Sequence, residues 1–145
     1  TKIAVASPGA WVLAADTVVE HGGVTLGKPA DAAEARHMLE TLSGQVHRVT
    51  TAVALAGPGE VEESFVVTTE VQVRDIAEAE LLGYLEAEEW RGKAGGYAIQ
   101  GMAAAFVREI RGSVTNVIGL PLAEVLALME RHQVAAADFP RGTPA

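Results

Sequence analysis

The chain has 145 residues, 49% of them hydrophobic, and a formal net charge of −8. This length is typical of one ordinary domain, and we predict a single domain over residues 1–145. The acidic balance disfavours nucleic acid as a partner, because the sequence has no Lys/Arg cluster to offset it. The lack of cysteine excludes disulfides, thiolate metal sites and cysteine nucleophiles. With no signal-peptide pattern and no apolar run long enough to span a bilayer, we expect a cytoplasmic protein without a membrane partner.

The first half of the chain alternates strand and helix patterns. Residues 11–19 form an apolar run that predicts a buried strand, with Asp16 as its one ionisable residue. A glycine turn and a short return strand then complete a hairpin. A helix is predicted after Pro29, because Asp31 and Glu34 form a capping-box pattern before apolar residues at helical spacing.

The second half begins with two β-branched runs at residues 46–57 and 61–75, which predict two long strands joined by a turn. Asp75 and Glu78 repeat the cap pattern before a short helix. Four glycines within residues 92–101 then break any regular period.

The last elements are a strand predicted over residues 103–112 and a helix that starts at Pro121. The apolar face of this helix is predicted to contain Leu122, Val125, Leu126 and Met129. The tail at residues 135–145 is expected to be loosely held. The histidines at positions 21, 37, 47 and 132 lack metal-ligand spacing, and we expect surface or helix-face roles for them.

The stretch GGVTLGKP at residues 22–29 differs by one residue from a phosphate-binding P-loop. A P-loop needs a helix that starts at its lysine, and a Ser or Thr next to that lysine. Here the segment belongs to a hairpin, and Pro29 has neither an N–H nor a hydroxyl to offer. We therefore reject a P-loop. Lys28 remains a candidate phosphate ligand, because the hairpin returns it towards Asp16.

Taken singly, these residues also have ordinary interpretations. From its position alone, Asp16 has even odds of being a functional residue or a turn former at the end of a strand. Lys28 and Lys93 are compatible with solvated surface lysines, and Gln100 with a residue that satisfies loop backbone groups. The glycines near Lys93 allow the chain to turn, although a close approach of backbone to a ligand requires the same residue.

Several motifs taken together resemble the Maf family of nucleoside triphosphate pyrophosphatases. In chain order they are A-D-T, L-G-K-P, L-S-G, K-A-G-G-Y-x-I-Q-G and N-V-x-G-L-P-L, and the resemblance covers most of residues 11–128. It implies an α/β, ITPase-like fold with an elongated, twisted mixed β-sheet flanked by helices, and a cleft between two lobes. It also implies hydrolysis of a nucleoside triphosphate to the monophosphate and pyrophosphate, with Mg²⁺ or Mn²⁺ as the divalent metal.

The resemblance assigns roles to five residues. Asp16 would activate the attacking water or hold the metal, and Lys28 and Lys93 would neutralise the triphosphate. Gln100 would contact the substrate or orient the water, and Thr17 would help to shape the base pocket. The I-Q-G pattern is that of the pyrimidine-preferring branch, whereas a branch that prefers a methylated guanine nucleotide has S-E-G. The resemblance thus implies dTTP and UTP as substrates.

The family pattern also includes segments before the A-D-T strand, namely a strand, an S-x-S-P-R-R-like loop and a helix with a glutamate. The present sequence begins about fifteen residues before Asp16, and VASPGA at residues 5–10 has no arginine. We therefore expect a Maf-like domain that is N-terminally incomplete, without the family's N-terminal strand and loop.

Two other classes of function remain as alternatives. One is a nucleotide-binding regulator of cell division and septum formation that does not hydrolyse its ligand, and the other is a purely structural module. An enzyme releases pyrophosphate, whereas a binder only shifts its melting temperature with nucleotide. A nucleoside triphosphate is the expected partner, and the sequence leaves the oligomeric state open between a monomer and a homodimer.

Overall fold

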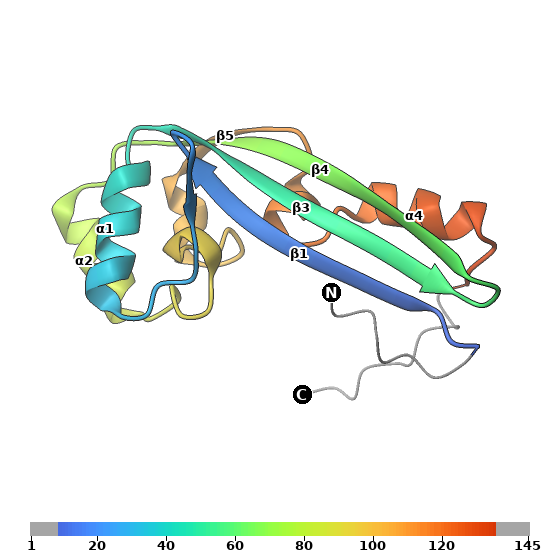
Figure 1. The fold of residues 1–145 in the computed structure, drawn as a ribbon. Helices are drawn as coiled ribbons and strands as arrows, with labels where there is room; N and C mark the ends of the chain where they lie inside the picture. Colours follow the sequence, from blue (N-terminus) through green and yellow to red (C-terminus); the bar gives the residue numbers. More distant parts are fainter. Residues whose placement is uncertain (1–8, 136–145) are drawn as a thin grey trace.

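The computed structural model describes residues 9–135 and shows one elongated sheet with helices at both of its ends (Figure 1). The strands are β1 (Val12–His21), β2 (Val24–Leu26), β3 (Val46–Gly57), β4 (Val61–Val73) and β5 (Val107–Arg111). The helices are α1 (Ala32–Leu42), α2 (Glu78–Glu86), α3 (Val114–Ile118) and α4 (Leu122–Arg131), with short 3₁₀ helices η1 (Ala94–Gly96) and η2 (Met102–Phe106). None of the helices within residues 9–135 is long and apolar enough to cross a membrane.

The strand order is β2-β1-β3-β4-β5. The α/β fold with an elongated sheet and flanking helices is confirmed, with one difference of detail. A mixed sheet was expected, but all four pairings among the described residues are antiparallel. The reason is that each connection, including the long one from β4 to β5, returns the chain in the opposite direction along its neighbour. The predicted hairpin of β3 and β4 pairs without interruption from Val46 opposite Gln72 to Gly57 opposite Val61.

The sheet buries one face, and that face carries two separate apolar cores. On β3 every second residue is buried, as expected for a strand with one covered face. Val49 belongs to a core that also contains α1 and α2, whereas Val53 and Leu55 belong to a core with α4. The buried Thr51 lies between them on the same face of the strand. The two cores therefore form the two lobes that the family resemblance implies.

The helix after Pro29 is confirmed, and two other element predictions require correction. Asp31 caps α1 by accepting a hydrogen bond from the Glu34 amide at 2.8 Å. Asp75, however, is not a cap: α2 begins at Glu78, and the Glu80 carboxylate accepts the hydrogen bond from the Ala77 amide. The strand predicted over residues 103–112 covers only β5, because the chain first forms η2.

Burial also differs from prediction in β1 and α4. Within β1 only Val19 is fully buried, and the residues around Asp16 line a pocket. Leu13 is only partly buried where it packs on the core with α4. On α4, Val125 and Met129 are buried as predicted, but Leu122 and Leu126 are exposed and Leu128 is buried. The face that packs on the sheet is therefore rotated from the predicted one. The expectations for residues 1–8 and 136–145 lie outside the described residues.

Candidate functional site

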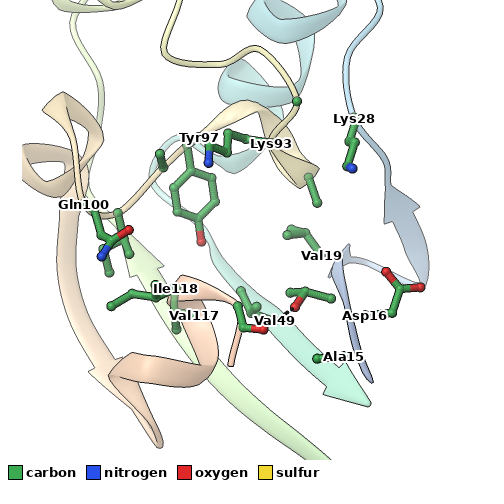
Figure 2. A pocket seen from close by; sticks show the side chains of 16 residues that line it. Ala15, Asp16, Val19, Lys28, Val49, Lys93, Tyr97, Gln100, Val117 and Ile118 are labelled. Carbon is green, nitrogen blue, oxygen red and sulfur yellow. Dashed lines mark hydrogen bonds between the residues drawn. The ribbon is translucent and has the colours of Figure 1, made fainter. Parts of the chain in front are cut away.

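A cavity of about 250 Å³ borders the first core, with walls from β1, the segment after β2, the loop around η1, and α3. Its lining includes all five residues singled out from the sequence, namely Asp16, Thr17, Lys28, Lys93 and Gln100. The structure thus brings these residues together from three separate segments, while their individual roles remain predictions. Figure 2 shows Lys28 on the same side of the pocket as Asp16, and Gln100 on the opposite side, near Ile118.

The charged side chains of the pocket have no partners among the residues that the structure describes. Asp16 is exposed on β1, opposite Ala52 in the strand register, and its carboxylate makes no hydrogen bond or ion pair within residues 9–135. It therefore lies at the edge of the cleft, as expected for an ionised carboxylate, which a sealed core would strongly disfavour. The side chains of Lys28 and Lys93 are also exposed and unpaired in the described part of the chain. With two lysines and one aspartate, the lining is locally positive in an acidic protein.

A backbone hydrogen bond joins the two segments that carry the lysines. The amide of Gly95, two residues after Lys93, donates to the carbonyl of Gly27, one residue before Lys28, at 3.0 Å. Gly95 has φ +71°, and an added Cβ there would lie 3.1 Å from Val19 Cγ1. Glycine is therefore needed at this position for both its conformation and its size.

The segment around Lys28 does not have the architecture of a P-loop. Lys28 lies in the connection between β2 and α1, and α1 begins only at Ala32. The first amides of the helix are therefore not adjacent to the lysine, as a P-loop would require. The rejection of the P-loop from sequence is confirmed.

Thr17 belongs to a polar network at the boundary between the two cores. Its hydroxyl lies 2.8 Å from the Thr51 hydroxyl and 3.4 Å from the Gly119 carbonyl oxygen. The fully buried Asn116 donates from Nδ2 to the Val49 carbonyl at 3.1 Å and to Thr69 Oγ1 at 2.8 Å. These bonds attach α3 to β3 and β4 and hold the floor of the pocket. Sequence reasoning missed Asn116, although it is the one polar side chain of the motif N-V-x-G-L-P-L.

His47 and Tyr97 form a buried polar pair that sequence reasoning also missed. His47 is 1% exposed, so the expected surface or helix-face role is wrong for this histidine. The reason is its position on β3, where it faces the core with Val49 and the other alternate residues. His47 Nε2 lies 2.6 Å from the Tyr97 hydroxyl, and the rings meet edge to face. Burial lowers the pKa of His47 to about 4 and raises the pKa of Tyr97, so both are neutral at neutral pH.

The donor set of the pocket fits a divalent metal that also binds substrate phosphates. Within residues 9–135, no three His, Asp or Glu side chains gather as a metal site of their own. Asp16 supplies the one carboxylate of the lining. Mg²⁺ commonly binds through one or two carboxylates together with phosphate oxygens and water. One unpaired carboxylate in the same lining as two lysines is consistent with such a site.

The protein is an α/β protein with one covered face of its sheet. Its pocket has two unpaired lysines and one unpaired carboxylate, and such a pocket suits an anionic, phosphate-bearing ligand. The chain belongs to the Maf-like protein family, which its residues 1–132 match.

Curated relatives of the chain share one name. A dTTP/UTP pyrophosphatase of Rhodospirillum rubrum is 55% identical over 84% of this chain and 58% of the relative. The dTTP/UTP pyrophosphatase of Myxococcus xanthus is 52% identical over 86% of this chain and 62% of the relative. The dTTP/UTP pyrophosphatase of Roseobacter denitrificans is 49% identical over 86% of this chain and 66% of the relative. The chain therefore spans less than two thirds of the length of these relatives.

Proposed function

We propose that this chain hydrolyses dTTP and UTP to the nucleoside monophosphate and pyrophosphate. The observation that carries the proposal is the meeting of Asp16, Lys28 and Lys93, all unpaired, in one pocket. The names of the relatives, at about half identity, support the choice of pyrimidine triphosphates.

The pocket residues account for the chemistry of this reaction. Attack of water at the α-phosphorus increases negative charge on the phosphoryl oxygens, and fixed cations lower the barrier by stabilising that charge. In the proposal Lys28 and Lys93 provide these cations, and Asp16 accepts the proton of the attacking water. Gln100 orients the substrate or the water, and Thr17 shapes the base pocket.

We also propose a dependence on Mg²⁺ or Mn²⁺. Asp16 would hold the ion together with the phosphates, and the ion would supply charge neutralisation of the triphosphate. We further propose that the protein acts in the cytoplasm. Light scattering can measure whether it is a monomer or a homodimer.

Pyrophosphate release provides the direct test. The protein should release pyrophosphate from dTTP and UTP with Mg²⁺ or Mn²⁺, and much less with a chelator or with ATP. A regulator that binds without hydrolysis would raise its melting temperature with dTTP and release nothing. A structural module would do neither, and either of these results would contradict the proposal.

A further inference from the structure

The ring of Tyr97 forms one wall of the pocket, and its hydroxyl points away from Lys93 towards Val49 and Val117 (Figure 2). This part of the lining is uncharged, in contrast to the part with Asp16 and the two lysines. A planar, uncharged base fits such a surface, where a few polar groups determine which base is accepted. The Tyr97 hydroxyl is a polar group in this part of the lining.

The hydroxyl of Tyr97 has a single hydrogen-bonding partner among the described residues, His47 Nε2 at 2.6 Å. The other ring nitrogen, His47 Nδ1, is buried and has no partner among residues 9–135. Because burial keeps the imidazole neutral, it has one N–H and one bare nitrogen. The bond to Tyr97 therefore exists in one of two forms.

The two forms differ in what they leave unsatisfied at Nδ1. If Tyr97 donates to Nε2, the imidazole proton is on Nδ1 and an N–H is buried without an acceptor. If Nε2–H donates to Tyr97, the unsatisfied group at Nδ1 is a lone pair, and the Tyr97 O–H is left to bond solvent or a ligand in the pocket. Buried N–H groups without acceptors are rarer in proteins than unsatisfied acceptors, which favours the second form. In that form the Tyr97 proton is free to bond a ligand in the pocket.

We propose that Tyr97 is a specificity-determining residue that donates a hydrogen bond to the O4 carbonyl of a uracil or thymine base, and that His47 is the positioning residue that keeps this hydroxyl a donor. This inference rests on the proposed function. Cytosine has an amino group at the same ring position, so a donor would meet a donor. If Tyr97 accepted from both His47 and that amino group, its own O–H would have no acceptor among the described residues. If it donated to His47 instead, Nδ1–H would be buried and unpaired.

The test compares kcat/KM for UTP and CTP in the wild type and three variants. The wild type should prefer UTP. Tyr97→Phe keeps the ring and removes the donor, so kcat/KM for UTP should fall on the order of tenfold while that for CTP changes little. In His47→Gln the glutamine amide can rotate to donate or to accept a hydrogen bond. Tyr97 can then either donate a hydrogen bond to the base or accept one from it. In this variant CTP hydrolysis should rise relative to UTP hydrolysis.

Tyr84→Phe provides a matched control. Tyr84 is fully buried, is absent from the pocket lining, and accepts a hydrogen bond from the Ala98 amide at 3.3 Å. Tyr84→Phe removes a tyrosine hydroxyl next to the loop that carries Tyr97, as Tyr97→Phe does. In this control the ratio of UTP to CTP hydrolysis should stay at the wild-type value.

Two results would overturn the inference while leaving the proposed function intact. One is a wild type that hydrolyses UTP and CTP equally well, and the other is a Tyr97→Phe variant with an unchanged UTP/CTP ratio. If the wild type hydrolyses neither dTTP nor UTP, the proposed function fails. Calorimetric titration with UMP and CMP then tests the base contact alone. A preference for UMP that Tyr97→Phe abolishes would support the contact, and no preference would contradict it.

Discussion

The two lysines of the pocket differ from most of the described arginines because they have no ion-pair partner. Both lysines within residues 9–135 line the pocket and are unpaired. Six described arginines, in contrast, form ion pairs with glutamates. Exposed charges held without partners contribute little to stability, so their substitution separates function from folding.

Asp16→Asn retains the shape of the side chain and removes the base. We expect pyrophosphate release from dTTP to collapse while the melting temperature stays near the wild-type value, because Asp16 is exposed and unpaired. Glu20→Gln is the matched control on the same strand, since Glu20 accepts a hydrogen bond from the Gly23 amide outside the pocket. Near-normal turnover of Asp16→Asn with metal present would refute the catalytic role.

Lys93→Ala removes one cation from the pocket wall. We expect a loss of about 2 to 4 kcal/mol in transition-state stabilisation, the typical cost of removing one preorganised group from an active site. The ratio of kcat/KM between wild type and variant measures it, and thermal unfolding should barely change. A large loss of stability with unchanged kinetics would instead identify Lys93 as a structural residue.

At the scale of elements, the pocket depends on two loops that the Gly95 to Gly27 hydrogen bond holds together. One loop follows β2 and the other contains η1, and they bring Lys28 and Lys93 to one site. The sequence motifs L-G-K-P and K-A-G-G-Y thus meet through their glycines.

Gly95→Ala should disrupt this meeting of loops. The added Cβ at φ +71° is strained and would also lie 3.1 Å from Val19 Cγ1. Gly59→Ala is the matched control, with φ +72° and nothing within 4 Å of its Cβ. The control should lose about 1 to 2 kcal/mol of unfolding free energy from strain alone, and its kinetics should not change. Gly95→Ala should lose more and also raise KM for dTTP. Equal losses in the two variants, with unchanged KM, would show that the contact with Val19 is unimportant.

At the scale of the whole molecule, two apolar cores share one sheet and meet at a polar boundary. Thr51, Thr69 and Asn116 are all buried at this boundary, and they attach α3 to the long strands. The pocket lies beside it, and Thr17 belongs both to the pocket lining and to the hydrogen bonds at this boundary.

The buried His47 makes the stability of the whole molecule depend on pH. Its pKa is lowered to about 4 by burial, with a further contribution from His21, whereas an unfolded histidine has a pKa of about 6.5. Below pH 6.5 the unfolded chain binds a proton that the folded chain does not, so stability falls with pH down to the folded pKa. Urea unfolding should show a loss of about 2 kcal/mol between pH 7.5 and pH 5 from this group.

His47→Gln should show a smaller loss over the same pH range, whatever its stability at pH 7.5. Tyr97→Phe should retain the wild-type pH dependence, because its histidine is still buried. The same pH dependence in the wild type and in His47→Gln would show that another group is responsible.

Much of the local structure follows from the sequence, because it depends on residues close together in the chain. The cap of α1 is made by Asp31 and Glu34, and the hairpin of β3 and β4 follows from two β-branched runs and a glycine turn. The five pocket residues were also named in advance, but on the strength of motifs shared with a family. Spacing alone left ordinary surface roles open for each of them.

Only the tertiary structure decided which of these residues meet and which are buried. Thr17 bonds to Gly119, 102 residues away, and His47 bonds to Tyr97, 50 residues away. The alternation of apolar and polar residues on β3 could indicate that one face of the strand is covered. It could not indicate that His47 would form a hydrogen bond with Tyr97 on that face. β1 appeared buried from its apolar run, yet it borders a pocket. The physical reason is the same in each case: periodicity reports the conformation of a segment, whereas burial and pairing depend on what distant segments place against it.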